Sequence, residues 1–243
     1  MPFLSIVIPA HNEARRLPGT MEKVLAFLQQ QPYQAEVLIV ENGSTDETLA
    51  LARQFEQAAP GVVRAIHETQ RGKGLAVRRG MLEARGEYRF LCDADLSMPI
   101  EELPKFLPPA LTDFDIAIAS RELPGSRRVD EPAYRHLIGR GFNLMVQALA
   151  LPGLHDTQCG FKCFRGPVAD ALFRRQTLDG MSFDVEILFI ARRWGYRIVE
   201  VPITWYFDPD SRVRLVQDSL RMGIELLTIR WRAWRGQYDP PQA

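Results

Sequence analysis

The sequence lacks any long uninterrupted run of apolar residues. A membrane-spanning helix needs about 18 of them, and the best stretch, Leu144 to Leu151, is short and contains Gln147, so it is expected to form a core helix. Residues 1–9 also lack the charged start and the small-residue cleavage site of a signal peptide. We therefore expect them to form a first strand, in a protein that stays in the cytoplasm.

Neither sign of charge is in excess, and cysteine is scarce. Lysine plus arginine and aspartate plus glutamate number 30 each, so no overall field attracts nucleic acid, and any basic site must be a local patch. Three cysteines favour reduced thiols over a disulfide framework. His155, Cys159 and Cys163 recur every four residues, which suggests zinc, but Gly153 and Gly160 argue against a continuous helix there.

The first 120 residues alternate strand-like and helix-like segments. Short β-branched or apolar runs predict strands at residues 4–9, 37–41, 62–67, 88–92 and 116–120. Apolar residues at helical spacing predict helices at residues 17–30, 45–58 and 74–85. This alternation predicts an α/β fold with a mostly parallel sheet flanked by helices. A dinucleotide-binding Rossmann domain is disfavoured, because no Gly-x-Gly-x-x-Gly follows the first strand and Pro9 occupies that turn.

Polar residues follow three of the predicted strands. Residues 9–13, 41–44 and 93–95 each lie where a strand ends, and ligands of parallel sheets bind at the carboxyl ends of the strands. We expect the three clusters to share one rim of the sheet. The run Ser-Thr-Asp-Glu at residues 44–47 also fits a capping box at the second helix.

Asp93 and Asp95 stand just past the apolar run of residues 88–92. Carboxylates two positions apart on an extended chain point the same way, so they can converge on Mg²⁺ or Mn²⁺, and such an ion neutralises a departing diphosphate. The alternative is that Asp93 hydrogen-bonds the turn while Asp95 caps the helix after residues 97–99. The pattern alone leaves both interpretations open.

Residues 121–140 form a basic, loop-rich passage that contains proline and glycine. Its arginines are Arg121, Arg127, Arg128, Arg135 and Arg140. One interpretation is a mobile loop on the side of an anionic acceptor, and the other is an ordinary solvated connection.

The segment from Val213 to Trp234 is predicted to be an amphipathic helix. Its apolar residues are Val216, Leu220, Gly223, Leu227, Trp231 and Trp234 along one face, widened by Met222, Leu226 and Ile229. Tryptophans and arginines near its end favour peripheral contact with an anionic membrane. Packing against the sheet or against a second subunit is the alternative, and a homodimer is left open.

Four motifs, taken in order, resemble those of family 2 glycosyltransferases, which have the GT-A fold. They are residues 6–13 (IVIPAHNE), 41–46 (ENGSTD), 71–74 (RGKG) and 93–95 (DAD). In the second half, residues 120–121 (SR), 156–162 (DTQCGFK), 183–186 (FDVE) and 211–212 (SR) resemble the branch that transfers glucose to dolichyl or polyprenyl phosphate. The resemblance covers nearly the whole chain, and the joint order of the motifs is more specific than any one of them.

The resemblance implies one domain over residues 1–243, with a nucleotide-binding half at 1–120, an acceptor half at 121–212 and an amphipathic helix at 213–235. It implies a nucleotide pocket formed by Pro9, Ala10, Asn12, Glu13, Glu41, Asn42, Gly43, Arg71, Lys73, Asp93 and Ala94. Asp93 and Asp95 would hold the metal. The sequence departs from the family in having Glu41 and Asn42 where two aspartates are common, which leaves the base less certain, and Ser97 replaces a glutamine of mannosyltransferase relatives.

A lipid phosphate is already an anion near neutral pH, since its second pKa is about 6, so its attack needs positioning by cations and no general base. The candidate acceptor-phosphate residues are Arg121, Arg135, Arg140, Ser211 and Arg212. A hydroxyl acceptor would instead need a carboxylate base, for which Asp156, Asp184 or Glu186 is available, although Asp184 and Glu186 also suit a helix start.

We therefore expect Asp95, Asp156 and Asp184 to be the catalytic residues of an inverting, metal-dependent transferase. It would move glucose from UDP-glucose to a polyprenyl or dolichyl phosphate. The rivals are a mannosyltransferase that uses GDP-mannose and the same lipid, a transferase to a soluble hydroxyl, and a non-catalytic protein that binds sugar nucleotides.

Overall fold

The computed structural model describes residues 1–210 and 215–240. Strands and helices alternate through the first half, as predicted, with ends that differ from the prediction by at most three residues. The first-half elements are β1 (Leu4–Ala10), α1 (Leu17–Gln29), β2 (Ala35–Asn42), α2 (Thr48–Ala58), β3 (Val63–Glu68), α3 (Lys73–Glu83), β4 (Tyr88–Cys92), the 3₁₀ helix η1 (Ile100–Phe106) and β5 (Ile116–Ser120). The second-half elements are β6 (Arg127–Val129), α4 (Ala133–Leu149), β7 (Phe161–Arg165), α5 (Gly166–Phe173), α6 (Phe183–Arg193), β8 (Ile198–Pro202), β9 (Thr204–Tyr206) and α7 (Leu215–Trp234).

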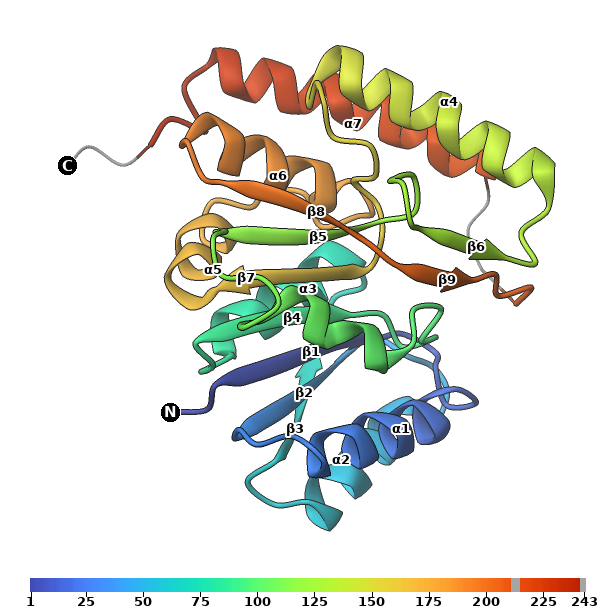
Figure 1. The fold of residues 1–243 in the computed structure, drawn as a ribbon, viewed down its shortest axis with the longest axis vertical. Helices are drawn as coiled ribbons and strands as arrows, with labels where there is room; N and C mark the ends of the chain where they lie inside the picture. Colours follow the sequence, from blue (N-terminus) through green and yellow to red (C-terminus); the bar gives the residue numbers. More distant parts are fainter. Residues whose placement is uncertain (211–214, 241–243) are drawn as a thin grey trace.

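A seven-stranded sheet with the order β3-β2-β1-β4-β7-β5-β8 forms the centre of the molecule (Figure 1). All of its neighbouring strands run parallel except β7, which pairs antiparallel with both β4 and β5. The prediction of a mostly parallel sheet flanked by helices is confirmed. A second, two-stranded sheet pairs β6 with β9 beside it.

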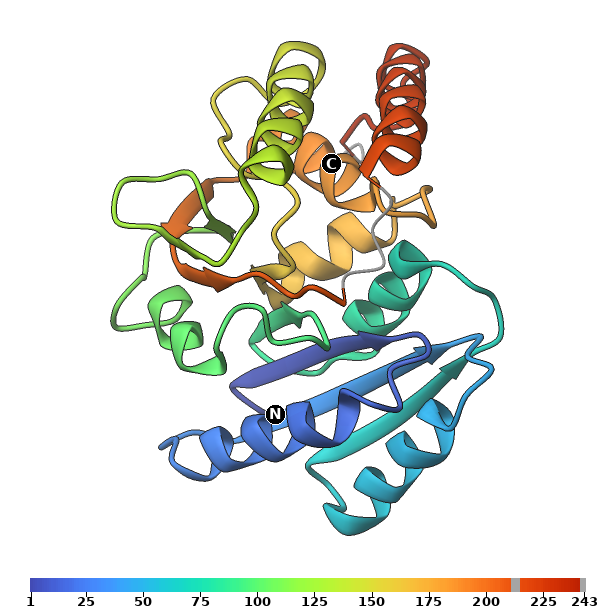
Figure 2. The same cartoon turned by 90° about the vertical axis from the view of Figure 1, so that its right-hand side faces the viewer.

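Alternate residues of each central strand enter two different cores, because successive side chains of a strand point to opposite faces. On β1, Ile6 and Ile8 pack with α1, α2 and η1, whereas Val7 packs with α3, α5 and α6. All three side chains are fully buried. The sheet is therefore a middle layer, and its strand ends are left to form the rim (Figure 2).

Helices α4 and α7 lie outside α6, as a further layer at the end of the molecule near β5 and β8 (Figures 1 and 2). Met222, Leu226 and Ile229 of α7 are buried against the rest of the molecule, while Leu227 and Trp231 are exposed. The prediction that the apolar residues of this helix share one face is therefore wrong, because some of them lie on a buried face and others on an exposed face. The side chains of Val216 and Leu220 are outside the part of the chain that the structure describes.

The capping box predicted at residues 44–47 is also wrong. Helix α2 begins at Thr48, and Oδ1 of Asp46 accepts the Thr48 N–H at 3.0 Å, while the hydroxyl of Ser44 accepts the N–H of Asn12. Ser44 therefore ties two loops together, and it is Asp46 that satisfies the first N–H of α2.

Cys159 and Cys163 are buried free thiols, and no group of three or more potential metal ligands occurs within residues 1–210 and 215–240. Likewise, none of the helices in these residues is long and apolar enough to cross a bilayer.

Candidate active site

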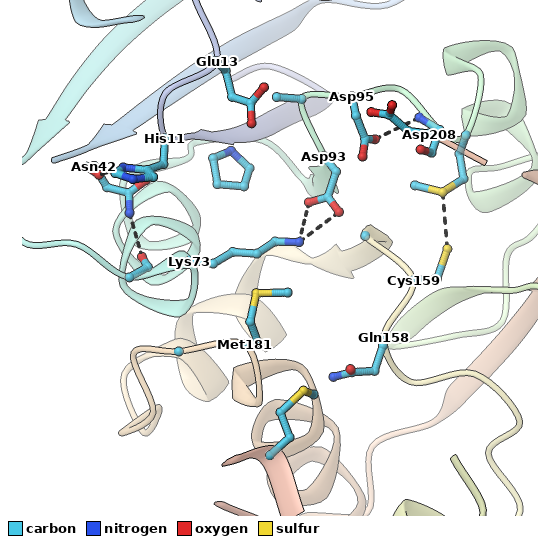
Figure 3. Close-up of a pocket in the computed structure, with 18 of the residues that line it drawn as sticks. His11, Glu13, Asn42, Lys73, Asp93, Asp95, Gln158, Cys159, Met181 and Asp208 are labelled. Carbon is cyan, nitrogen blue, oxygen red and sulfur yellow. Dashed lines mark hydrogen bonds and ion pairs between the residues drawn. The ribbon is translucent and has the colours of Figure 1, made fainter. Parts of the chain in front are cut away.

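A cleft of about 830 Å³ opens at the carboxyl ends of β1, β2 and β4. Its wall includes Pro9 near the end of β1, Glu13 after that strand, Asn42 at the end of β2, and Asp93 and Asp95 after β4. The three polar clusters expected to share one rim of the sheet do meet there (Figure 3). The second half of the chain closes the cleft with residues from several loops and from α4 and α7.

The loops after β1 and β2 are fastened to each other. Oδ1 of Asn12 accepts the N–H of Thr45 at 2.8 Å, and the hydroxyl of Thr48 accepts the N–H of Glu13 at 2.8 Å. Between them the chain turns at Gly43, whose φ of +63° is a left-handed conformation that suits glycine. These contacts hold Pro9, Glu13 and Asn42 at fixed places in the wall.

Glu41 lies behind this wall. Its side chain is 1% exposed, and its carboxylate accepts the N–H of Ser44 at 2.5 Å and contacts Nδ1 of His67 at 2.6 Å. Burial raises the pKa of Glu41, but the two contacts outweigh it, so the pKa is below its ordinary value and the group is ionised. Glu41 therefore shapes the turn, and it is Asn42 that reaches the cleft.

Lys73, at the start of α3, lies against the aspartates that end β4. Its Nζ is 2.8 Å from Oδ1 and 2.9 Å from Oδ2 of Asp93 (Figure 3). Desolvation lowers the pKa of Lys73, but the charges of Asp93, Asp184 and Asp95 outweigh it and raise the pKa. The lysine therefore stays cationic at the base of the cleft.

Asp95 does not cap the helix that follows it, because η1 begins at Ile100 and its N-cap residue is Pro99. Oδ1 of Asp95 accepts the N–H of Ser97 at 2.9 Å, as a turn-forming aspartate does. Desolvation and the negative charge of Asp93 raise the pKa of Asp95, against the opposing effects of the Ser97 N–H and Lys73. Two carboxylates that repel each other in this way are stabilised when a cation binds between them.

The residues at Asp93 and Asp95 fit a divalent ion that is shared with a ligand. Mg²⁺ and Mn²⁺ prefer oxygen donors, and Mg²⁺ is commonly held by one or two carboxylates together with substrate phosphates. No third His, Cys, Asp or Glu completes a metal site in the described residues, so the remaining oxygen atoms would come from a diphosphate and water. Glycine at position 160 leaves room for the Asp93 carboxylate, which an added Cβ atom would overlap.

Asp184, predicted to be catalytic, is 3% exposed and does not line the cleft. It pairs at 2.6 Å with Nζ of Lys162, which is 1% exposed on β7. Burial raises the pKa of Asp184, and Lys162 and Lys73 oppose this. Glu186 is also buried, and it accepts the N–H groups of Thr177 and Leu178. Both residues support the cleft wall from behind.

Asp156, the third predicted catalytic residue, is also behind the wall. Its two carboxylate oxygens are 2.6 Å from Nε and 3.0 Å from Nη2 of Arg121, and it accepts the Arg121 N–H as well. Burial raises the pKa of Asp156, but Arg121 outweighs it and the pKa is lowered. The placement of Asp156 makes it a positioning residue for Arg121, which does line the cleft.

Two arginines of the cleft pack on aromatic rings. The guanidinium of Arg121 is 5.3 Å from the ring centroid of Trp205, and that of Arg135 is 5.0 Å from that of Phe207. Both rings also line the cleft. Stacking of this kind fixes a guanidinium in place at the wall of the cleft.

The structure thus divides the predicted site residues into three groups. Those in the cleft wall are Pro9, Glu13, Asn42, Arg71, Lys73, Asp93, Ala94, Asp95, Arg121 and Arg135. Those outside the wall are Ala10, Asn12, Glu41, Gly43, Asp156 and Asp184, together with Arg140, which is exposed on α4. Ser211 and Arg212 lie outside the described residues.

Several wall residues were not predicted. Among them are Arg16, Gln158, Trp205, Phe207, Asp208 and Arg221. Gln158 points into the cleft (Figure 3), and its buried Nε2 has no hydrogen-bond partner in the part of the chain that is described. The alternation of apolar residues at 203, 205 and 207 was the available signal for the two aromatic rings, because it places them on one face of a strand.

Solved structures of similar fold include those of a glucosyl-3-phosphoglycerate synthase. Glucosyl-3-phosphoglycerate synthase from Mycobacterium tuberculosis, in complex with Mn²⁺, UDP-glucose and phosphoglyceric acid, aligns with a TM-score of 0.67 and 17% identity, covering 100% of this chain and 82% of that one. Its UDP complex gives a TM-score of 0.66 and 18% identity, with the same coverage. The architecture is therefore the GT-A fold of glycosyltransferases.

Sequence comparison identifies the family. Residues 5–173 match the model described as Glycosyl transferase family 2. Curated relatives named dolichyl-phosphate beta-glucosyltransferase include those of Dictyostelium discoideum (32% identity, 95% of this chain and 74% of the relative), Homo sapiens (33%, 96% and 77%) and Saccharomyces cerevisiae (32%, 97% and 76%). The chain belongs to glycosyl transferase family 2 and is an enzyme of the glycosyltransferase class.

Proposed function

We propose that the protein transfers glucose from UDP-glucose to dolichyl or polyprenyl phosphate, with a divalent ion at Asp93 and Asp95. The names of the relatives support the sugar and the lipid. The observation that carries the proposal is the make-up of one cleft, in which a lysine and two aspartates at the sheet rim share a wall with arginines from the second half.

The donor is assigned to the first half of the chain. Asn42 and the loop after β1 would contact the nucleoside, and Arg71 and Lys73 would contact the diphosphate, whose negative charge they complement. A divalent ion bound by Asp93 and Asp95 supplies neutralisation of the charge that develops on the departing UDP. Lys73, with its raised pKa, supports this at any pH near neutral.

The acceptor is assigned to Arg121 and Arg135. The phosphate of a polyprenyl phosphate repels the donor diphosphate, and arginines held on Trp205 and Phe207 offset that repulsion at a fixed place. Asp156 assists from behind, because it holds the Arg121 guanidinium through two contacts. Arg140, Ser211 and Arg212 are not needed for this assignment.

The burial of Asp156 and Asp184 favours an acceptor that needs no general base. Each carboxylate is paired with a basic residue and lies outside the cleft wall. A phosphate nucleophile, with a second pKa of about 6, arrives already ionised. Its attack on the face opposite UDP is a single displacement, so an α-linked donor gives a β-linked product.

The proposal places the protein in the cytoplasm, peripherally at the inner face of a membrane, since its acceptor is a lipid. The test is incubation with Mn²⁺ and radiolabelled UDP-glucose or GDP-mannose, with and without polyprenyl phosphate, followed by extraction into organic solvent. We expect organic-soluble label from UDP-glucose only, and only when both Mn²⁺ and the lipid phosphate are present.

Two variants sharpen the assay. Asp95→Asn is expected to abolish turnover, and Arg135→Ala to slow transfer at least tenfold while UDP binding is kept. Arg53→Ala removes an exposed charge of α2 and is expected to change neither. Label from GDP-mannose would assign the donor to the mannosyl rival, transfer to a soluble hydroxyl only would reject the lipid acceptor, and absence of UDP release from any donor would identify a non-catalytic binding protein.

A further inference from the structure

Helices α4 and α7 carry large apolar side chains on their outer surfaces. On α4, Tyr134 is 62% exposed, Leu137 73% and Leu144 61%. On α7, the exposed apolar residues are Ile224, Leu227, Trp231 and Trp234, with exposures of 67%, 60%, 49% and 83%. Single exposed apolar residues are ordinary, but seven on two neighbouring helices are typical of an interaction surface.

The two sets of residues face the same way. Val146 of α4 is fully buried, and Leu137 and Leu144 lie on the opposite side of the helix at 3.6 residues per turn. On α7, Leu226 and Ile229 are buried, whereas Ile224, Leu227 and Trp231 lie on the opposite side.

Met145 of α4 packs on Gly223 of α7, so the helices are in contact, and both form the outermost layer of the molecule (Figures 1 and 2). We name these seven residues the α4/α7 face.

Most of the charged residues described on the α4/α7 face and next to it are basic. Helix α4 contains no aspartate or glutamate, and its exposed charged residue is Arg140. On the described part of α7, Arg230 is exposed, as is Arg235 just beyond its end, with the guanidinium of Arg235 4.3 Å from the ring centroid of Trp231. Glu225 is turned to the side, where it pairs with Arg221 at 3.2 Å.

This charge pattern favours an anionic membrane over a second copy of the chain as the partner of the α4/α7 face. A second copy of the chain docked symmetrically on the same face would bring the exposed arginines against each other. Among the described side chains of α4 and α7 the acidic one is Glu225, which already pairs with Arg221. An anionic bilayer complements the arginines, and its interface accommodates tryptophan side chains, which have an apolar body and a polar N–H.

Both helices also border the cleft. Arg135 of α4 and Arg221 and Met222 of α7 are wall residues of the same cleft that holds Asp93 and Asp95. We propose that the α4/α7 face lies on an anionic membrane surface, and that the cleft receives the phosphate of a lipid acceptor from between these two helices. The second part of this inference rests on the proposed function, and the first does not.

Flotation with lipid vesicles tests the first part. The full chain is mixed with vesicles of phosphatidylcholine alone or of phosphatidylcholine with phosphatidylglycerol, and the bound fraction is measured. We expect binding to the anionic vesicles that weakens with salt. Two double variants remove apolar contact area: Leu227→Ser combined with Trp231→Ser on α7, and Leu137→Ser combined with Leu144→Ser on α4. Each is expected to lower the partition coefficient for anionic vesicles at least tenfold.

Val62→Ser is the matched control. Val62 is 36% exposed just before β3, at the opposite edge of the sheet, and its replacement is expected to leave binding unchanged. Circular dichroism and UDP binding establish that each variant is folded. Failure of the wild type to float, or equal flotation of wild type and face variants, would overturn the inference. So would a dimer, seen by analytical ultracentrifugation, that the same substitutions dissociate.

The second part is tested with two acceptors. A short-chain, water-soluble prenyl phosphate requires no membrane, so the face variants are expected to turn it over like the wild type. A long-chain polyprenyl phosphate in anionic vesicles should be glucosylated about tenfold more slowly by the variants, since fewer molecules are at the surface. Equal rates on vesicles would reject the inference alone, whereas wild-type inactivity on both acceptors would reject the proposed function and leave the flotation result standing.

Discussion

At the scale of single residues, Gly160 packs directly against Asp93 of the predicted metal site. Its carbonyl oxygen accepts the N–H of Asp93 at 3.2 Å, and a Cβ atom added to it would overlap the Asp93 carboxylate. Gly160→Ala is therefore expected to displace that carboxylate and to weaken Mn²⁺-dependent UDP binding at least tenfold, as measured by calorimetry.

The matched control is Gly139→Ala on α4, where an added Cβ atom meets nothing within 4 Å. Alanine favours the helix over glycine by about 0.5–1 kcal/mol, so this variant should bind UDP normally and be slightly more stable. Unchanged UDP affinity in Gly160→Ala would mean that Asp93 does not have to occupy its observed position.

The ion pair of Asp156 with Arg121 is expected to contribute to the free energy of unfolding in a pH-dependent way. The pKa of Asp156 is lowered in the fold by Arg121, so the contribution is complete above the unfolded-state pKa and is lost as the pH falls through the folded-state pKa. Asp156→Asn breaks a buried ion pair and is expected to lower the free energy of unfolding by about 3 kcal/mol at pH 7. The difference from wild type should shrink below about pH 4.

Urea unfolding at several pH values measures this difference. Asp239→Asn is the control, because the pair of Asp239 with Arg193 is half-exposed and such pairs contribute only about 0–1 kcal/mol. A destabilisation of Asp156→Asn that is the same at every pH would show that the Asp156 charge is not its source.

Residue types could be predicted from the sequence, but side-chain directions could not. Asp93 and Asp95 follow a strand end and so had to be at the rim, where the structure has them. Asp156 and Asp184 stand in motifs of the same appearance, yet each is turned inward to a basic residue that is distant in sequence, Arg121 or Lys162. Only the packing of β5, β7 and α6 determines that direction.

At the scale of elements, the segment after β9 is tied across the cleft to the start of α1. Nη2 of Arg16 is 2.6 Å from Oδ2 of Asp208 and 2.9 Å from the carbonyl oxygen of Asp210, and Phe207 and Asp208 line the cleft. Arg16→Met keeps the apolar stem of the side chain and removes these contacts. Turnover is expected to fall about tenfold, while stability changes by less than about 1 kcal/mol, because the pair is partly exposed.

Arg15→Met is the control for this prediction, since Arg15 pairs with Asp210 at an exposed position away from the wall. Steady-state kinetics and urea unfolding of both variants provide the measurement. Equal effects of the two substitutions on turnover would contradict a specific role for the Arg16 contacts.

The first-half elements could be predicted, whereas β6, β7, β8 and β9 could not. The strands of the first half are short β-branched runs between amphipathic helices, and their predicted ends are close to the observed ones. Strand β7 contains Lys162, a charged residue that is not expected in a central strand and that is satisfied here by Asp184 and by the carbonyl oxygen of Cys159. Strands β6 and β9 have three residues each, too few for a periodicity to be recognised.

At the scale of the whole molecule, β7 joins the two halves of the sheet. It pairs on one side with β4, which continues to β1, β2 and β3, and on the other with β5, which continues to β8. We therefore propose that the chain is one domain, and expect a single unfolding transition in urea, with the same midpoint by tryptophan fluorescence and by far-ultraviolet circular dichroism. Two separate midpoints would mean that the halves fold independently.

The assembly of the cleft was predicted only in part. The sheet rim follows from the order of strands, which the helical crossovers imply. The opposite wall depends on α4, α7 and the segment around Trp205 and Phe207, whose positions arise from packing between parts distant in sequence. The same packing divides α7 into a buried face and an exposed face, a division that helical periodicity alone does not contain.

The most direct test of the account is a crystal structure of the protein with Mn²⁺ and UDP, with data collected at a wavelength where manganese scatters anomalously. We predict an anomalous peak between the carboxylates of Asp93 and Asp95 and the diphosphate, with the uracil beside Asn42. A complex in which UDP binds elsewhere, or in which manganese is absent from these two aspartates, would contradict it.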